Sequence, residues 1–230
     1  MSGDLNHEDS IFRASGLIGY LIKRLNEDYP NKQVGKTVVQ KMVYLLSRKN
    51  IAKFDFSMYH YGPYSSELSA ELSFTEKNGI IEITWKDNEG YFIKPTNDAE
   101  KFLSLINSDE RRAIDETVDQ FGKFRAIDLS LIATALYLKD NFDVEDSKLA
   151  EAVHNAKKSY SPDYITNVLK AGKIMSNYKS LWHIVLAISG VSRFLHQARH
   201  ANSLHVTNLH LMIYKRICGS CISRKLCYVS

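Results

Sequence analysis

The stretch FDFSMYHYGPYSSEL, residues 54–68, decides the fold class because it interrupts a chain that is otherwise patterned for helices. Residues 54–61 alternate in character and are rich in aromatic side chains, which predicts a short β-strand. The Gly62-Pro63 pair that follows is a turn signal. The chain is helical again after this turn, so the strand is a small β element within a helical protein.

Helical periodicity surrounds this stretch on both sides. Helices are expected at about residues 9–29, 36–49, 66–79, 98–106, from 109 onward, 129–138, 145–158 and 162–174. The expected N-caps are Ser65 or Ser66, Thr96 or Asn97, Ser108 and Ser161. Residues 129–138 are strongly apolar and predict a central buried helix, whereas residues 145–158 predict an exposed amphipathic one.

A second β element is the clearest hairpin signal in the chain. Two β-prone runs, residues 80–85 and 91–94, flank the turn-rich residues 86–90. We therefore predict a mainly α protein with a small β element, an α+β class. Its helical domain carries one strand and a hairpin wing at about residues 80–94.

Charge divides the chain into two parts. The 230 residues have a net charge of +4, but residues 164–230 hold nine Lys and Arg and no Asp or Glu. We predict a helical domain over residues 1–178 and a basic, His- and Cys-containing tail over residues 179–230 that is poorly ordered. The tail has three open interpretations: an arm for nucleic acid, an amphipathic surface for anionic lipid, or a sequence not selected for folding.

The cellular compartment can be predicted from three features that the sequence lacks. The N-terminus is polar and acidic rather than a secretory signal, and no apolar run reaches the roughly 18 residues of a transmembrane segment. The three cysteines are too few and too close to the C-terminus for a disulfide framework. These features predict a soluble cytoplasmic protein.

The most site-like feature is a block of nine consecutive residues. It comprises Tyr59, His60, Tyr61, Gly62, Pro63, Tyr64, Ser65, Ser66 and Glu67. Alternation would place Tyr59 and Tyr61 on one strand face and His60 on the other. The serines would lie at a helix N-terminus, where free backbone N–H groups favour a phosphate or carboxylate. The block is then a binding edge, or else a packed turn whose serines only cap the helix.

Catalysis and metal binding have weaker sequence support. A serine nucleophile needs a base and a group that orients it, and Glu67 is the one acid within the block. Zinc needs four ligands, often in two close pairs. The weak metal candidates in the tail are Cys218, Cys221, Cys227 and His210, which lack a second pair. We predict no enzyme activity, no catalytic residue, no metal site and no cofactor.

The order helix, helix, strand, helix, hairpin suggests a winged-helix element and hence a DNA-binding regulator. Two features oppose this alternative. About fifteen residues separate the second and third helices, against roughly 3–4 in a helix-turn-helix. The third helix carries Glu67, Glu71 and Glu76, whereas a helix in the major groove approaches phosphates and needs Lys or Arg.

Three stretches together carry a family resemblance: KTVVQKMVYLL at residues 36–46, the stretch at 54–68, and LIATALYL at 131–138. In this order they resemble the YwgA-type family, which is similar to Panacea antitoxin-like domains in pairing a leucine-rich helix with Tyr-Gly-Pro-Tyr-Ser. The resemblance covers roughly residues 10–178.

The resemblance implies a cytoplasmic helical domain that acts through protein contacts, neutralising a toxin or serving as an adaptor. No toxin-contact residue can be carried over. We therefore predict a non-enzymatic, regulatory protein-interaction domain with a protein partner such as a toxin. DNA binding is the alternative, and the oligomeric state stays open.

Overall fold

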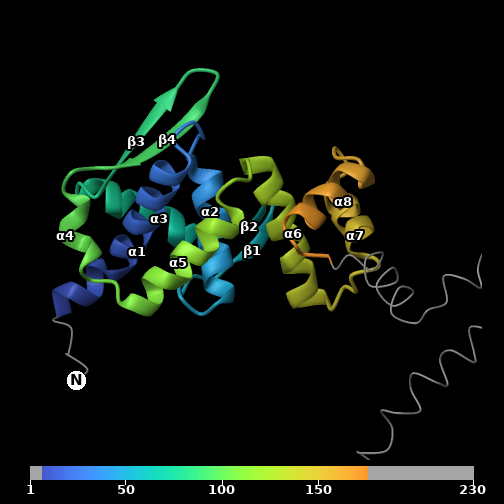
Figure 1. The fold of residues 1–230 in the computed structure, drawn as a ribbon, viewed down its shortest axis with the longest axis horizontal. Helices are drawn as coiled ribbons and strands as arrows, with labels where there is room; N and C mark the ends of the chain where they lie inside the picture. The colour runs from blue at the N-terminus through green and yellow to red at the C-terminus, as the bar shows by residue number, and fades with distance from the viewer. Residues whose placement is uncertain (1–6, 176–230) are drawn as a thin grey trace, which may run out of the picture. The chain divides into compact units, whose positions relative to one another are not determined.

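The computed structural model describes residues 7–175. Over this range the chain is mainly α-helical with two small antiparallel sheets, which confirms the predicted α+β class (Figure 1). The elements in chain order are α1 (His7–Asp28), α2 (Lys36–Arg48), β1 (Ser57–Tyr59), β2 (Gly62–Tyr64), α3 (Ser66–Lys77), β3 (Ile81–Lys86), β4 (Gly90–Pro95), α4 (Ala99–Leu103), α5 (Ser108–Phe121), α6 (Ala126–Phe142), α7 (Leu149–Ala156) and α8 (Pro162–Ala171).

Helix α1 supplies one apolar face of the core. Its fully buried residues recur at the spacing that places side chains on one side of a helix: Leu17, Ile18, Leu21, Ile22 and Leu25. The helix packs against α3, α4 and α5 and against strand β4. It ends just before Pro30, which lacks the N–H donor that a helix interior needs.

Helix α6 is buried on all sides over its middle. Residues 129–136 are all buried, so no polar face remains there and the predicted central helix is confirmed. Helix α2 packs against α6, as do α7 and α8, which lie beside each other in Figure 1. Helix α7 is shorter than predicted because residues 145–148 lie outside it, and its Leu149 and Val153 are buried against this group.

The helix caps follow the sequence in part. Ser65 and Ser161 cap α3 and α8 through their side chains, as predicted. Helix α5 is capped by Asn107 rather than Ser108, because Asn107 and Glu110 form a reciprocal capping box. The N-cap of α4 is Asp98, not Thr96 or Asn97 as predicted, and the Thr96 hydroxyl donates instead to the backbone carbonyl groups of residues 79 and 80.

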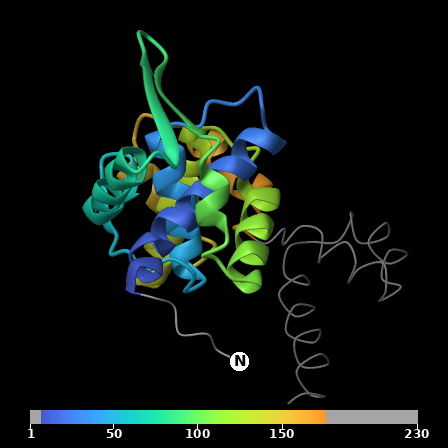
Figure 2. The same ribbon diagram turned by 90° about the vertical axis from the view of Figure 1, so that its left-hand side faces the viewer.

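Strands β3 and β4 form the predicted hairpin. Their register runs from Ile81 opposite Pro95 to Lys86 opposite Gly90. Figures 1 and 2 both show this hairpin projecting away from the helices. Its base stays attached to the core through Ile81 and Ile93, which are buried.

The other hairpin differs from the prediction. The strand expected over residues 54–61 is only three residues long, and the chain reverses at His60 and Tyr61. Gly62 and Pro63, predicted as the turn, lie in strand β2 and pair with β1. A glycine with positive φ directly after a two-residue turn is typical of hairpins with a glycine bulge, and Gly62 has φ +88°.

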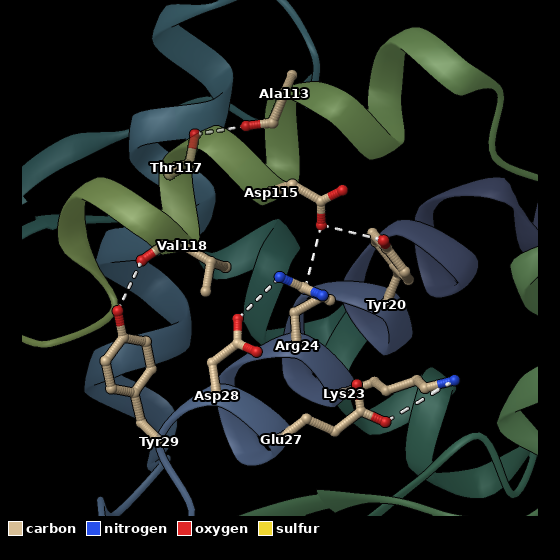
Figure 3. A network of polar contacts seen from close by, with 10 residues as sticks. All are labelled: Tyr20, Lys23, Arg24, Glu27, Asp28, Tyr29, Ala113, Asp115, Thr117 and Val118. Atoms are coloured by element: carbon tan, nitrogen blue, oxygen red, sulfur yellow. Dashed lines mark hydrogen bonds and ion pairs between the residues drawn. The ribbon is translucent and has the colours of Figure 1, made fainter.

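A polar network joins α1 to α5 (Figure 3). Asp115 accepts a hydrogen bond from Tyr20 at 3.0 Å and pairs with Arg24 at 3.1 Å. Arg24 also pairs with Asp28 on its own helix, at 2.9 Å. Half-exposed ion pairs of this kind contribute at most about 1 kcal/mol each. The network therefore makes a modest contribution to the packing of α1 against α5.

Within residues 7–175, no helix combines the length and the apolar character needed to cross a membrane.

Candidate functional site

The predicted binding block forms the tip of the β1–β2 hairpin and the start of α3. The prediction that Tyr59 and Tyr61 share a strand face opposite His60 is wrong. His60 and Tyr61 are the turn itself, so strand alternation ends at Tyr59. Both tyrosines are nevertheless well exposed, at 60% and 69% of their surface.

Gly62 allows this hairpin to approach α6 closely. A Cβ atom at Gly62 would lie 2.7 Å from Thr134 Oγ1 and 3.2 Å from the Ser130 carbonyl oxygen. Real Cβ contacts are longer than this, because the atoms repel one another. Positive φ and lack of space thus both require glycine at this position.

Side chains from three helical regions hold the backbone of the hairpin. Three donors reach its carbonyl oxygens: Lys41 Nζ to Pro63 at 2.7 Å, Ser130 Oγ to Tyr61 at 2.6 Å, and Lys157 Nζ to His60 at 2.9 Å. These donors come from α2, α6 and the C-terminal cap of α7. The hairpin is therefore fixed by contacts that are distant in the sequence.

Ser65 is the cap of α3 and is fully engaged. Its side chain accepts from the Leu68 N–H at 3.2 Å, and its backbone exchanges two hydrogen bonds with the Gln40 amide at 2.8 and 3.0 Å. Ser65 is buried, whereas Ser66 is exposed as the first residue of the helix. Capping of α3 is thus sufficient to explain the position and the hydrogen bond of the Ser65 side chain.

A groove of about 380 Å³ lies beside this hairpin. Its walls come from the first half of α2, the middle of α3, the β1–β2 hairpin and strand β3: Lys36, Thr37, Gln40, Lys41, Tyr59, Tyr61, Gly62, Tyr64, Ser69, Leu72, Ser73 and Ile83. No Asp or Glu is among these residues. The groove therefore combines aromatic side chains, hydroxyl groups and two lysines.

Three tyrosines of the hairpin line the groove. The rings of Tyr59 and Tyr64 lie 5.6 Å apart between centroids, and His60 packs edge-on to Tyr59 at 4.7 Å. The Tyr64 hydroxyl accepts from Ser69 Oγ at 2.9 Å, which ties its ring to α3. These contacts hold the rings of Tyr59 and Tyr64 in place without covering them.

Lys41 is the unusual residue of the groove. Only 2% of the surface of Lys41 is exposed, although lysine is almost never fully buried unless it is paired. Burial, and then the nearby positive charge of Lys157, lowers the pKa of Lys41 to about 8. The contact described for its ammonium group is the Pro63 carbonyl, a neutral acceptor.

The remaining residues of the predicted block lie outside the groove. Glu67 borders a separate, smaller hollow of about 290 Å³ together with Asp55 and Ser47. His60, Pro63, Ser65 and Ser66 do not line the groove, although the first three help to form or hold the hairpin.

Sequence reasoning missed the residues that α2 contributes. Lys36, Thr37, Gln40 and Lys41 all line the groove, and none of them is in the predicted block. One signal was available: Lys41 lies three residues after Val38 and four before Leu45, on the buried face of α2. A lysine on an apolar face has to reach a partner or a ligand.

Metal binding gains no support from the described part of the chain. Residues 7–175 contain no group of three or more His, Cys, Asp or Glu side chains that could hold a metal ion. The weak candidates Cys218, Cys221, Cys227 and His210 lie outside the described residues.

The chain is similar to the uncharacterised protein YwgA of Bacillus subtilis (strain 168). The two are 26% identical over 146 residues, which cover 60% of this chain and 84% of that protein. This similarity supports a YwgA-like relationship. No protein-family profile matches the chain. The link to Panacea antitoxin-like domains stays a prediction.

Proposed function

We propose that this protein is a non-enzymatic, regulatory interaction domain that binds a partner protein at the tyrosine-lined groove between α2, α3 and the β1–β2 hairpin. The observation that carries the proposal is the set of exposed tyrosines that line this one groove. Tyr59 and Tyr61 are 60% and 69% exposed, and Tyr64 lines the same groove and accepts a hydrogen bond from Ser69 of α3.

Tyrosine is well suited to protein recognition. Its ring supplies a large contact area with few rotatable bonds, and Tyr, Trp and Arg dominate the residues that contribute most to protein interfaces. Here the backbone that carries the rings is held before binding by hydrogen bonds from Lys41, Ser130 and Lys157. Pre-organisation of this kind lowers the entropy that binding would lose.

An antitoxin-like role is one form of this function. The partner would then be a toxin whose surface is covered on binding, as the resemblance to Panacea antitoxin-like domains implies. An adaptor role would use the same groove with a different protein. Both forms place the partner on the hairpin tyrosines and in the cytoplasm.

Capture of the partner from its native extract by the immobilised full chain tests the proposal. The double variant Tyr59→Ala, Tyr61→Ala should lose a stoichiometric protein that the wild type retains, with affinity at least about tenfold weaker. Phe142→Ala is the matched control, since Phe142 is an aromatic residue 65% exposed on α6 and outside the groove.

Two outcomes would reject the proposal. Equal capture by the wild type and the double tyrosine variant would remove the tyrosines from the interface. Recovery of nucleic acid alone, with retention that falls steeply as salt increases, would favour the DNA-binding alternative.

A further inference from the structure

Lys41 is a buried cation without a described carboxylate partner. Its ammonium group donates to the Pro63 carbonyl at 2.7 Å, and the positive charge of Lys157 acts on it and lowers its pKa further. An ammonium group carries three donors. A neutral carbonyl satisfies one of them and leaves the charge uncompensated.

Such an arrangement is unfavourable for folding alone. Taking a charge out of water costs several kcal/mol unless an opposite charge and hydrogen bonds compensate it. Lys32 provides a comparison within the same chain. It also donates to a backbone carbonyl, that of Gly122, and burial lowers its pKa to about 8 as well. The negative charge of Asp128 opposes this shift in Lys32, whereas the positive charge of Lys157 adds to it in Lys41.

The surroundings of Lys41 are electropositive and rich in donors. Lys36 lies at the same groove, at the first turn of α2, and its ammonium group sits 4.0 Å from the centre of the Tyr91 ring. The N-cap of α2 is Gly35, which has no side chain to satisfy the free N–H groups of that turn. Thr37 and Ser73 add hydroxyl groups to the walls.

We propose that the groove accepts an acidic side chain, Asp or Glu, from a segment of the partner protein, and that Lys41 is the charge partner of its carboxylate. This inference rests on the proposed function and adds the chemistry of the segment that binds. Charge complementarity selects the occupant, because two lysines and no acidic residue line the groove. The tyrosines then contact the flanking residues of the segment.

Acetate is the simplest probe of this carboxylate site, and acetamide is its neutral control. The full chain is titrated near pH 7 with each at equal ionic strength, and NMR follows the Lys41 side-chain Cε and the backbone amides of Gln40 and Gly62. We expect saturable shifts with acetate and none with acetamide. In Lys41→Met the affinity for acetate should fall at least about tenfold, and Lys32→Met should retain it.

Absence of a saturable acetate shift in the wild type would overturn the inference, as would an unchanged acetate affinity in Lys41→Met. If Lys41→Met does not fold, the wild-type titration decides alone, because a shift of Lys41 with acetate and not with acetamide requires no variant.

Partner capture separates this inference from the proposed function. Loss of the partner in the tyrosine variant with full capture by Lys41→Met would reject the carboxylate site and leave the proposed function standing. Full capture by the tyrosine variant would reject the proposed function itself. Loss of the partner in both variants supports the proposed function. It supports the carboxylate site only together with the acetate shift of the wild type, because Lys41→Met also releases the Pro63 carbonyl of the hairpin.

Discussion

The two hairpins of this protein reach the same topology in different ways. The β3–β4 hairpin has long β-prone strands and a turn rich in polar residues, and it projects from the helices (Figure 2). Beyond its base it is contacted by Gln33, which donates to Glu89 and Tyr91, and by Lys36, which lies over the Tyr91 ring. The β1–β2 hairpin is three residues long on each side and is held by donors from α2, α6 and α7. The first depends mainly on the pairing of its own strands, and the second depends mainly on tertiary contacts.

This difference explains where the candidate site lies. A hairpin that is stabilised by the pairing of its own strands does not need a buried lysine from another element to hold its backbone. Lys41 is buried against the β1–β2 hairpin, where it donates to the Pro63 carbonyl. The same lysine also lines the groove beside the tyrosines. Burial of that charge without a described carboxylate costs free energy, which an acidic group from a partner would offset.

The largest expected effect concerns the close approach of the β1–β2 hairpin to α6. Gly62→Ala should lower the free energy of unfolding by about 3 to 4 kcal/mol, since it adds strain at positive φ and a contact too close to Thr134. Gly79→Ala is the matched control, because Gly79 has φ +69° with no atom within 4 Å of an added Cβ. It should lower stability by about 1 kcal/mol. Equal losses in chemical denaturation would contradict the tight packing of this hairpin.

A second effect isolates the charge of Lys41. The folded protein holds the pKa of Lys41 at about 8, below the value of 10.5 for an unpaired lysine. The unfolded chain therefore binds more protons between these two pH values, and stability should rise with pH across that window. Relative to Lys41→Met, the wild type should gain about 2 to 3 kcal/mol between pH 8 and pH 10.5.

Urea denaturation at several pH values measures this difference, with the other titrating groups common to both proteins. Lys32→Met is the positive control, since burial also lowers the pKa of Lys32 to about 8. The two free energies of unfolding could instead differ by the same amount at every pH. That result would show that folding does not lower the pKa of Lys41.

A smaller effect tests the junction of the β1–β2 hairpin with α3. Ser65→Ala removes a buried cap and should reduce the free energy of unfolding by about 1 to 2 kcal/mol. Ser66→Ala changes an exposed neighbour and should remain within about 0.5 kcal/mol of the wild type. Similar melting temperatures for the two variants would mean that Ser65 does not act as the cap.

The smallest effect should come from the β3–β4 hairpin. Trp85 and Tyr91 pack edge to face at 4.8 Å, and Trp85 is 58% exposed. Trp85→Ala should lower stability by about 0.5 kcal/mol, because an exposed cross-strand pair contributes little to the rest of the fold. A loss above about 2 kcal/mol would show that this hairpin is coupled to the core as strongly as β1–β2.

Much of the fold could be predicted from the sequence because it depends on local signals. The apolar stripe of α1, the continuous burial of α6, the Ser161-Pro162 start of α8 and the β3–β4 pairing all follow from periodicity, capping and turn residues. The errors at Thr96 and Ser108 arose where several polar residues compete for one cap. The local pattern identifies the residues that could cap a helix but does not show which of them does.

The candidate site was predictable only in part. The tyrosines stood out because they gather in one short block, but the role of Gly62 was misassigned as a turn residue. Its position depends on Thr134, which is 72 residues away in the sequence. Lys41 was passed over for a related reason: its partner is a backbone carbonyl at Pro63, and a backbone atom has no sequence signature.

The pKa of Lys41 in the free, full-length protein is the most direct measurement of whether its charge is unpaired in the groove. An NMR titration of the Lys41 Cε and Nζ signals should give a value of about 8. A value at or above the ordinary 10.5 of lysine would show that a carboxylate already neutralises the ammonium group, and the groove would then offer no free positive charge to a partner.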